Sequence, residues 1–291
     1  MTLITTPLQQ AQDFMLTNGR LLERQLFSYL FGDGTRELVL QALRAYQNAD
    51  GGFGNALEPD KRCPDSQPQD VEFALHVLDV LGSLDDPLVQ RACDYLDSIT
   101  TPEGGVPFAL PSVNAYPHAP WWTSDENPPA SLNPTAAIVG LLLKHRVRHP
   151  WIERAAQFCW QAIAAIDTTE FHTLMPVLQF LEHAPERERA NHELRRVAAR
   201  LSQPGVIELD PQASGYVQKP LNWAPTPDSF CRRLFTDETI ATHLDALARR
   251  QQADGGWPIS WDTLSPAVAY EWRGRVTIEA LSTLRAYQYN I

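Results

Sequence analysis

The sequence of 291 residues is poor in cysteine and lacks the motifs that bind metals or cofactors. Its four cysteines, Cys63, Cys93, Cys159 and Cys231, lie far apart, with no CxxC pair and no histidine at a zinc-finger spacing. It also has no GxGxxG, Walker or HExxH sequence. We therefore expect no metal site and no cofactor, and we expect Cys93 and Cys159 to be core residues.

Long hydrophobic runs and an excess of basic residues are absent as well. No stretch approaches the roughly 20 apolar residues that span a bilayer, and residues 1–12 lack the basic start and apolar run of a signal peptide. We expect a cytoplasmic protein without a membrane span. The 24 basic and 35 acidic residues give a net charge of -11, which disfavours nucleic acid as a partner. The hydrophobic content of 44% is sufficient for a sizeable core.

Apolar residues recur at intervals of three and four along most of the chain, which is the pattern of helices, and no segment alternates as a strand does. The expected helices cover residues 7–31, 36–48, 69–83, 86–98, 133–147, 150–165, 169–184, 187–203, 236–252 and 271–289. The sequence therefore predicts an all-α protein.

The connections between these helices fall into two classes. Those at 32–35, 84–85, 148–149 and 185–186 are short, whereas those at 49–68, 99–132, 204–235 and 253–270 are long and contain proline. Because the two classes nearly alternate, the long connections are expected at one end of the helical array. Loops on a rigid scaffold commonly carry binding and catalytic residues.

Two segments of the chain repeat each other without a gap. Residues 42–53, ALRAYQNADGGF, align with residues 246–257, ALARRQQADGGW, and residues 95–108 retain a degenerate third copy. In both full copies a helix ends in Asp-Gly-Gly, followed by the aromatic ring of Phe53 or Trp257. We expect this ring to stack on the glutamine of the preceding turn and to fasten the loop to the helix.

The segments Gln47–Phe53 and Gln251–Trp257 resemble the QW-type repeats of terpenoid cyclases, including squalene cyclases, and the helix-pair repeats of protein prenyltransferase β-subunits. The resemblance implies an α/α toroid in which about six inner helical elements surround a cavity and outer helices lie behind them. Residues 1–291 would form one such domain. The outer helices would be those at 36–48, 86–98, 150–165, 187–203 and 236–252, and a degenerate inner segment would lie within 204–235.

The catalytic motifs of these families are not found in this sequence. It contains neither DxDD nor DDxxD, and the zinc ligands of the prenyltransferases have no matching residues. Asp85 and Asp86 come closest to DxDD, but they lie in a short connection. Catalytic residues are therefore expected among the polar side chains of the long connections.

Three polar clusters are candidates. Glu58 and Asp60 flank Pro59, and two such carboxyl groups can divide into an acid and a base; alternatively they bind loop N–H groups or cap a helix. The second cluster has an acid–base candidate in His118, two acids and an amide, within a proline-rich stretch expected to form an ordered lid. Asp125 and Glu126 are further catalytic candidates, and Asn127 is a candidate for binding the substrate. His118 is alternatively a hydrogen-bonded packing residue.

The third cluster begins the last helix, where Glu271 is an acid candidate and Arg273 can bind an anionic group. Glu271 alternatively complements the helix dipole. Five tryptophans in or next to the long connections are candidates for binding an apolar substrate, or else they pack the loops. They are Trp121, Trp122, Trp223, Trp261 and Trp272.

The leading hypothesis is a metal-independent enzyme that resembles the cyclases and transferases and uses carboxylate acid–base chemistry on a small or medium apolar, isoprenoid-like substrate. A second hypothesis is a carbohydrate-active hydrolase or lyase on the same fold, with two carboxyl groups roughly 5 to 9.5 Å apart across an open groove. A third is a non-catalytic module that binds a hydrophobic ligand or a protein.

Overall fold

The computed structural model describes residues 6–291, and these residues form helices and loops without a β-strand. By internal contacts the chain divides into two compact units. We call Leu43–Leu201 the middle unit, and Met1–Ala42 together with Ser202–Ile291 the terminal unit. The prediction of an all-α protein is confirmed.

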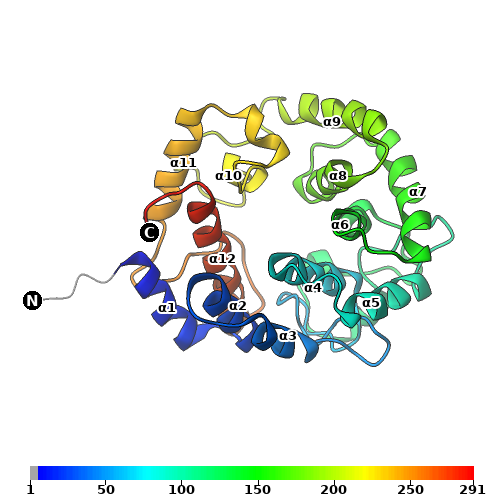
Figure 1. Cartoon of the computed structure of the whole chain (residues 1–291), viewed down its shortest axis with the longest axis horizontal. Helices are drawn as coiled ribbons and strands as arrows, with labels where there is room; N and C mark the ends of the chain where they lie inside the picture. Colours follow the sequence, from blue (N-terminus) through cyan, green and yellow to red (C-terminus); the bar gives the residue numbers. More distant parts are fainter. Residues whose placement is uncertain (1–5) are drawn as a thin grey trace, which may run out of the picture. The chain divides into compact units, whose positions relative to one another are not determined.

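The middle unit has two layers of helices (Figure 1). Most residues of α4 (Pro68–Leu81) and α6 (Leu132–Lys144) are buried, as are six of the 13 residues of α8 (Phe171–His183), and α6 packs against both α4 and α8. Behind them lie α5 (Pro87–Ser98), α7 (Pro150–Ala164) and α9 (Arg187–Leu201), which bury one face and expose the other. The alternation of inner and outer helices predicted for this part of the chain is confirmed.

The terminal unit contains α1 (Pro7–Asn18), α2 (Leu21–Phe31), α10 (Pro220–Trp223), α11 (Asp237–Arg249) and α12 (Pro266–Ala286). The helix α3 (Arg36–Arg44) crosses the boundary between the two units. The core joins α1, α2, α11 and α12 around Phe14, Trp257 and Leu281.

The structure corrects the prediction of a single helix over residues 7–31. The chain leaves helical geometry at Gly19, with ψ 144°, and at Arg20, with ψ 162°, so α1 and α2 are separate. The apolar period continues across the break, because both helices turn apolar residues toward the same core, and periodicity alone therefore concealed it. Similarly, α12 begins at Pro266 rather than at Glu271.

Proline explains where many of the helices begin. Its fixed φ suits the first helical turn and its missing N–H costs nothing there. Six α-helices begin with it: α1, α4, α5, α7, α10 and α12. The short connections predicted between α2 and α3, α4 and α5, α6 and α7, and α8 and α9 are all present.

Each Gly-Gly turn fastens its loop to the start of another helix. In the first turn the Gln47 amide donates to the carbonyls of Gly51 and Leu88, both at 2.9 Å. In the second turn Gln251 donates to the carbonyls of Gly255 and Pro7, both at 2.8 Å. The glutamine therefore acts through hydrogen bonds to backbone carbonyls of its own turn and of a proline-initiated helix.

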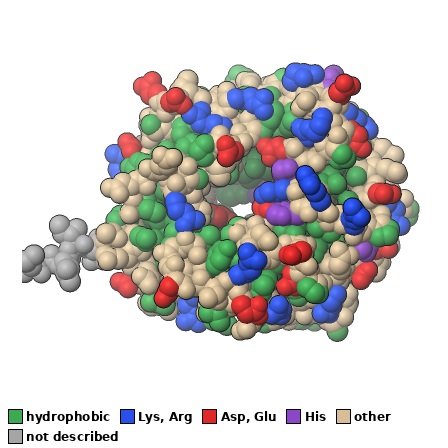
Figure 2. Space-filling model, in the orientation of Figure 1, with side chains coloured by type: hydrophobic (Ala, Val, Ile, Leu, Met, Phe, Trp, Pro, Cys, Tyr) green, Lys and Arg blue, Asp and Glu red, His purple; other side chains and the backbone are tan. Residues whose placement is uncertain are grey.

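Acidic and basic side chains are interspersed over the face of the molecule drawn in Figure 2, so on that face the excess of acidic residues is not gathered into one patch. Within residues 6–291, no helix combines the length and hydrophobicity needed to cross a membrane.

Candidate active site

The loop that follows the first Gly-Gly turn, residues 54–67, is unusual because most of it is buried. Residues 56–61 are all buried, including the charged side chains. The loop is closed where the N–H of Asn55 donates to the Pro64 carbonyl and that of Ala56 to the Cys63 carbonyl. Asn55 and Ala56 both have φ 58°, a strained conformation for residues other than glycine. Loops normally lie on the surface, and strained, buried polar loops are concentrated at functional sites.

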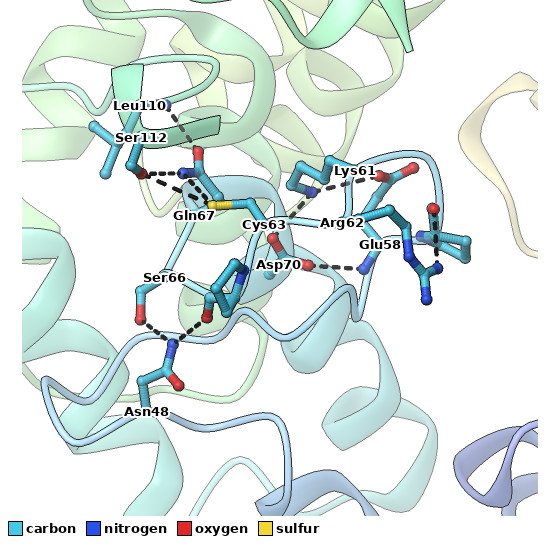
Figure 3. A network of polar contacts seen from close by, with 12 residues as sticks. Asn48, Glu58, Lys61, Arg62, Cys63, Ser66, Gln67, Asp70, Leu110 and Ser112 are labelled. Carbon is cyan, nitrogen blue, oxygen red and sulfur yellow. Dashed lines mark hydrogen bonds and ion pairs between the residues drawn. The ribbon is translucent and has the colours of Figure 1, made fainter. Parts of the chain in front are cut away.

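The buried loop and α4 bring three charged side chains into contact (Figure 3). The Lys61 Nζ lies 3.0 Å from Asp70 Oδ2 and 3.5 Å from Glu58 Oε2. The other oxygen of Asp70, Oδ1, accepts the backbone N–H of Glu58 at 2.7 Å. The side chains of Glu58, Lys61 and Asp70 are only 7%, 1% and 1% exposed. We call these three residues the charged triad.

The second long connection of the middle unit covers this loop. The Lys61 ammonium lies 4.4 Å from the centre of the Trp122 ring, and Phe108 stacks on the same indole at 4.8 Å. The backbone of His118 pairs with that of Lys61, and the Ala119 N–H donates to the Asp60 carbonyl. The Glu58–Asp60 loop and the predicted lid are therefore parts of one assembly in the middle unit.

Neutral hydrogen bonds hold the base of the loop (Figure 3). The Gln67 amide donates to Ser112 Oγ at 2.9 Å, and its Oε1 accepts the Leu110 N–H at 2.8 Å. The Asn48 amide donates to the Pro64 carbonyl at 2.9 Å and to Ser66 Oγ at 3.0 Å. These contacts fix the C-terminal end of the loop, residues 64–67.

Burial raises the pKa of Glu58 from 4.5 to about 7. The Lys61 ammonium acts in the opposite direction, while the carboxylates of Asp70 and Asp60 raise the pKa further. Near neutral pH, Glu58 can therefore exist with or without its proton, which is the property required of a general acid or base.

The other predicted residues of the middle unit either lie next to the charged triad or are exposed to solvent. Asp60 is buried in the loop, and Trp122 covers Lys61. The imidazole of His118 faces the Tyr116 carbonyl, 2.6 Å from Nδ1, and Thr123 Oγ1, 3.2 Å from Nε2. The remaining candidates are exposed: Trp121, Asp125, Glu126 and Asn127.

The predicted residues of the terminal unit form a separate group. Glu271 lies 3.8 Å from the guanidinium of Arg20, and Arg273 forms two hydrogen bonds with Asp254, at 2.8 and 2.6 Å. Trp261 and Trp272 meet edge to face at 5.2 Å, and Trp223 is buried. The roles assigned to these residues remain predictions.

A second polar cluster joins α4 to α6 away from the triad. Asp79 Oδ1 lies 2.5 Å from His145 Nε2 and 2.7 Å from Lys144 Nζ. Burial opposes ionisation, but hydrogen bonds from Lys144 and His145 hold the pKa of Asp79 below its usual value. The polar groups of this cluster bind one another, so the cluster has a structural role and links α4 to α6.

Sequence reasoning missed both Lys61 and Asp70 as site residues. The spacing of Glu58 and Lys61 by three residues was a usable signal for an ion pair. The contribution of Asp70 arises from folding, because twelve residues separate it from Glu58.

No family model matches the chain, and no curated protein matches its sequence. Solved structures do match it. A protein from Actinoplanes has a TM-score of 0.59 and 17% identity, over 96% of this chain and 98% of that one. The type II terpene cyclase MstE from Scytonema, without ligand, has a TM-score of 0.54 and 15% identity, over 95% and 88%.

A variant of MstE in complex with geranylgeranyl dihydroxybenzoate, its substrate, matches with a TM-score of 0.52 and 15% identity, over 95% of this chain and 88% of that one. At this identity the likeness shows the fold alone. The chain has an all-helical fold like that of type II terpene cyclases, which confirms the predicted α/α-toroid class.

Proposed function

We propose that this protein is an enzyme that binds a small or medium-sized apolar, prenyl-type molecule and transfers a proton to or from it through Glu58. The observation that carries the proposal is the charged triad, a buried carboxyl group with a pKa of about 7 held beside an ammonium group. The fold supports the substrate class, since a cyclase of similar fold binds a geranylgeranyl compound.

The surroundings of Glu58 suit both directions of proton transfer. Before the reaction, burial keeps the carboxyl group protonated. After donation, the Lys61 ammonium at 3.5 Å stabilises the carboxylate. In an isomerisation or cyclisation, the carboxylate then recovers a proton from a C–H bond of the cation, so the enzyme is regenerated and no co-reactant is consumed.

Trp122 supplies a polar group next to the charged triad. Its indole Nε1 is buried and has no hydrogen-bond acceptor among residues 6–291. Buried N–H groups are nearly always paired. We infer that an acceptor atom on the bound molecule, such as a hydroxyl or carbonyl oxygen, completes this contact.

Incubation with geranylgeranyl dihydroxybenzoate and with shorter prenyl alcohols tests the proposal. The wild-type protein should form isomers of unchanged mass, detected by chromatography with mass spectrometry. Glu58→Gln should reduce the rate at least about 100-fold. Glu103→Gln replaces an exposed acid of the long connection that covers the loop and should have no effect.

Equal rates for Glu58→Gln and the wild type would exclude Glu58 as the proton carrier. Binding that quenches tryptophan fluorescence without any conversion would favour a ligand-binding module. Turnover of oligosaccharides instead of prenyl compounds would favour the hydrolase or lyase.

A further inference from the structure

The charged triad contains an internal asymmetry. The Lys61 ammonium lies closer to Asp70, at 3.0 Å, than to Glu58, at 3.5 Å. Coulombic attraction in a buried setting rises steeply as separation falls, so Lys61 primarily compensates Asp70. Asp70 also lies in the first turn of α4, where the helix dipole favours a negative charge. Because Lys61 pairs mainly with Asp70, its ammonium group would balance a negative charge on Glu58 only in part.

Asp70 also fixes the position of Glu58. While Oδ2 contacts Lys61, Oδ1 accepts the backbone N–H of Glu58 at 2.7 Å. One carboxylate on α4 thus ties the buried loop at two points, and α4 is among the most deeply buried helices of the middle unit. The charged groups facing Glu58 are Lys61 and Asp60 of its own loop and Asp70 of α4. The covering connection contributes the Trp122 ring, while the His118 imidazole contacts Tyr116 and Thr123.

We propose that Asp70 is a positioning residue which holds the Lys61 ammonium closer to itself than to Glu58, so that Glu58 is the member of the triad that gains and loses a proton. This inference rests on the proposed role of Glu58 in proton transfer. It adds that the protonation of Glu58 is controlled from α4, by a residue that does not itself exchange the proton.

The burial of the triad supports this division of roles. Two carboxyl groups, those of Glu58 and Asp70, contact one ammonium group, the Asp60 carboxylate acts on Glu58 as well, and all four residues are buried. Ionising all three carboxyl groups would leave buried negative charge without compensation, which is costly. Burial and the carboxylates of Asp70 and Asp60 raise the pKa of Glu58, and Lys61 lowers it. The proton is therefore retained at Glu58.

Asp70→Asn tests the inference without any substrate. The asparagine retains an oxygen for the Glu58 N–H, but it no longer competes for the Lys61 ammonium. The ammonium should then compensate Glu58, and the midpoint at which Glu58 titrates should fall by about one pH unit or more. Lys61→Met should move the midpoint upward by a similar amount. The midpoint is read from the infrared band of the protonated carboxyl group, which Glu58→Gln identifies by removing it.

Asp79→Asn is the matched control, because it removes an aspartate–lysine pair from the same helix, α4, and should leave the midpoint unchanged. An unchanged or raised midpoint in Asp70→Asn would overturn the inference. If Asp70→Asn does not fold, the test relies on Lys61→Met. An unchanged or lowered titration midpoint of Glu58 in Lys61→Met would also overturn the inference.

Kinetics separate this inference from the proposed function. If Asp70→Asn moves the titration of Glu58 but no prenyl compound is converted by any variant, the proposed function fails and the electrostatic role of Asp70 stands. If the wild type converts prenyl compounds and Asp70→Asn has the same titration and the same pH–rate profile, the function stands and the role of Asp70 fails.

Discussion

The two Gly-Gly turns have nearly the same backbone structure but continue into different loops. In each turn a glycine with φ near 90° follows the aspartate, 92° at Gly51 and 91° at Gly255. The next glycine donates its N–H to that aspartate, Asp50 or Asp254. The first turn leads into a loop whose residues 56–61 are all buried, whereas none of residues 258–265 after the second turn is buried.

Continuing the alignment without a gap shows where the loops diverge. Glu58 corresponds to Asp262, which is exposed, and Lys61 corresponds to Ser265, which caps α12. The second loop ends there because α12 begins at Pro266, whereas the first loop continues to Pro68. The additional residues allow the first loop to fold back and bury its charged groups. The repeated turn therefore has a structural role, which is to attach a loop to a helix. The candidate catalytic residues belong to the loop that follows the first turn only.

The largest effect is expected from Gly51→Ala and Gly255→Ala. A Cβ at Gly51 would lie 2.3 Å from the Arg91 carbonyl oxygen, and one at Gly255 would lie 2.0 Å from that of Gln10. Positive φ and this clash together should cost about 3 kcal/mol or more in each variant, measured by denaturant unfolding. Only Gly51→Ala should also shift the titration of Glu58. An equal shift in Gly255→Ala would show that the two turns are not independent.

The next effect concerns the pH dependence of stability in the two loops. Glu58 has a folded pKa of about 7 against 4.5 in the unfolded chain, so its contribution is fully present below pH 4.5 and is lost as pH rises through 7. The loss is on the order of 3 kcal/mol. Glu58→Gln should therefore gain stability relative to the wild type between pH 5 and 8, as measured by urea unfolding. Asp262→Asn, at the corresponding exposed position, should follow the wild-type curve; parallel curves for all three proteins would contradict the burial of Glu58.

Most of the fold was predictable from the sequence because its signals are local. The helical period and the two Asp-Gly-Gly segments located the helices and the repeated turns. The break at Gly19 was missed because the apolar pattern of residues 7–31 does not change there. The spacing of apolar residues indicates which side of a helix is buried. It does not reveal a break between two helices that bury the same side.

The site was only partly predictable, because its decisive contacts join residues distant in sequence. Glu58 and Asp60 were recognisable as paired acids, and Trp122 as a loop tryptophan. The effect of Lys61 depends on its approach to Asp70 on another element, and the burial of all four charges depends on the second connection. Exposed acids such as Glu126 carry the same sequence signal as Glu58, since composition does not reveal burial.

A moderate effect is expected from the glutamines that fasten the two turns. Gln47→Met and Gln251→Met preserve much of the side-chain volume and remove two hydrogen bonds each. The cost should be about 2 kcal/mol for Gln47 and about 1 kcal/mol for Gln251, because the bond from Gln251 to Pro7 is exposed to solvent. Thermal and denaturant unfolding measure both. A larger loss at Gln251 would reverse the expected order.

The smallest effect is expected from Ala56→Gly, which tests whether the first loop is strained at Ala56. Ala56 has φ 58°, and glycine adopts this conformation without the cost of roughly 1 kcal/mol that alanine incurs. Ala56→Gly also loses one buried methyl group, worth about 0.8 kcal/mol, and about 0.5 kcal/mol through the greater freedom of the unfolded chain, so the variant should be only about 0.3 kcal/mol less stable than the wild type. Ser260, at the corresponding position of the second loop, has no positive φ, and Ser260→Gly should lose about 0.5 kcal/mol through the greater freedom of the unfolded chain. A loss above about 1 kcal/mol in Ala56→Gly, measured by urea unfolding, would mean that the loop conformation at Ala56 is not strained and that the methyl group is needed there.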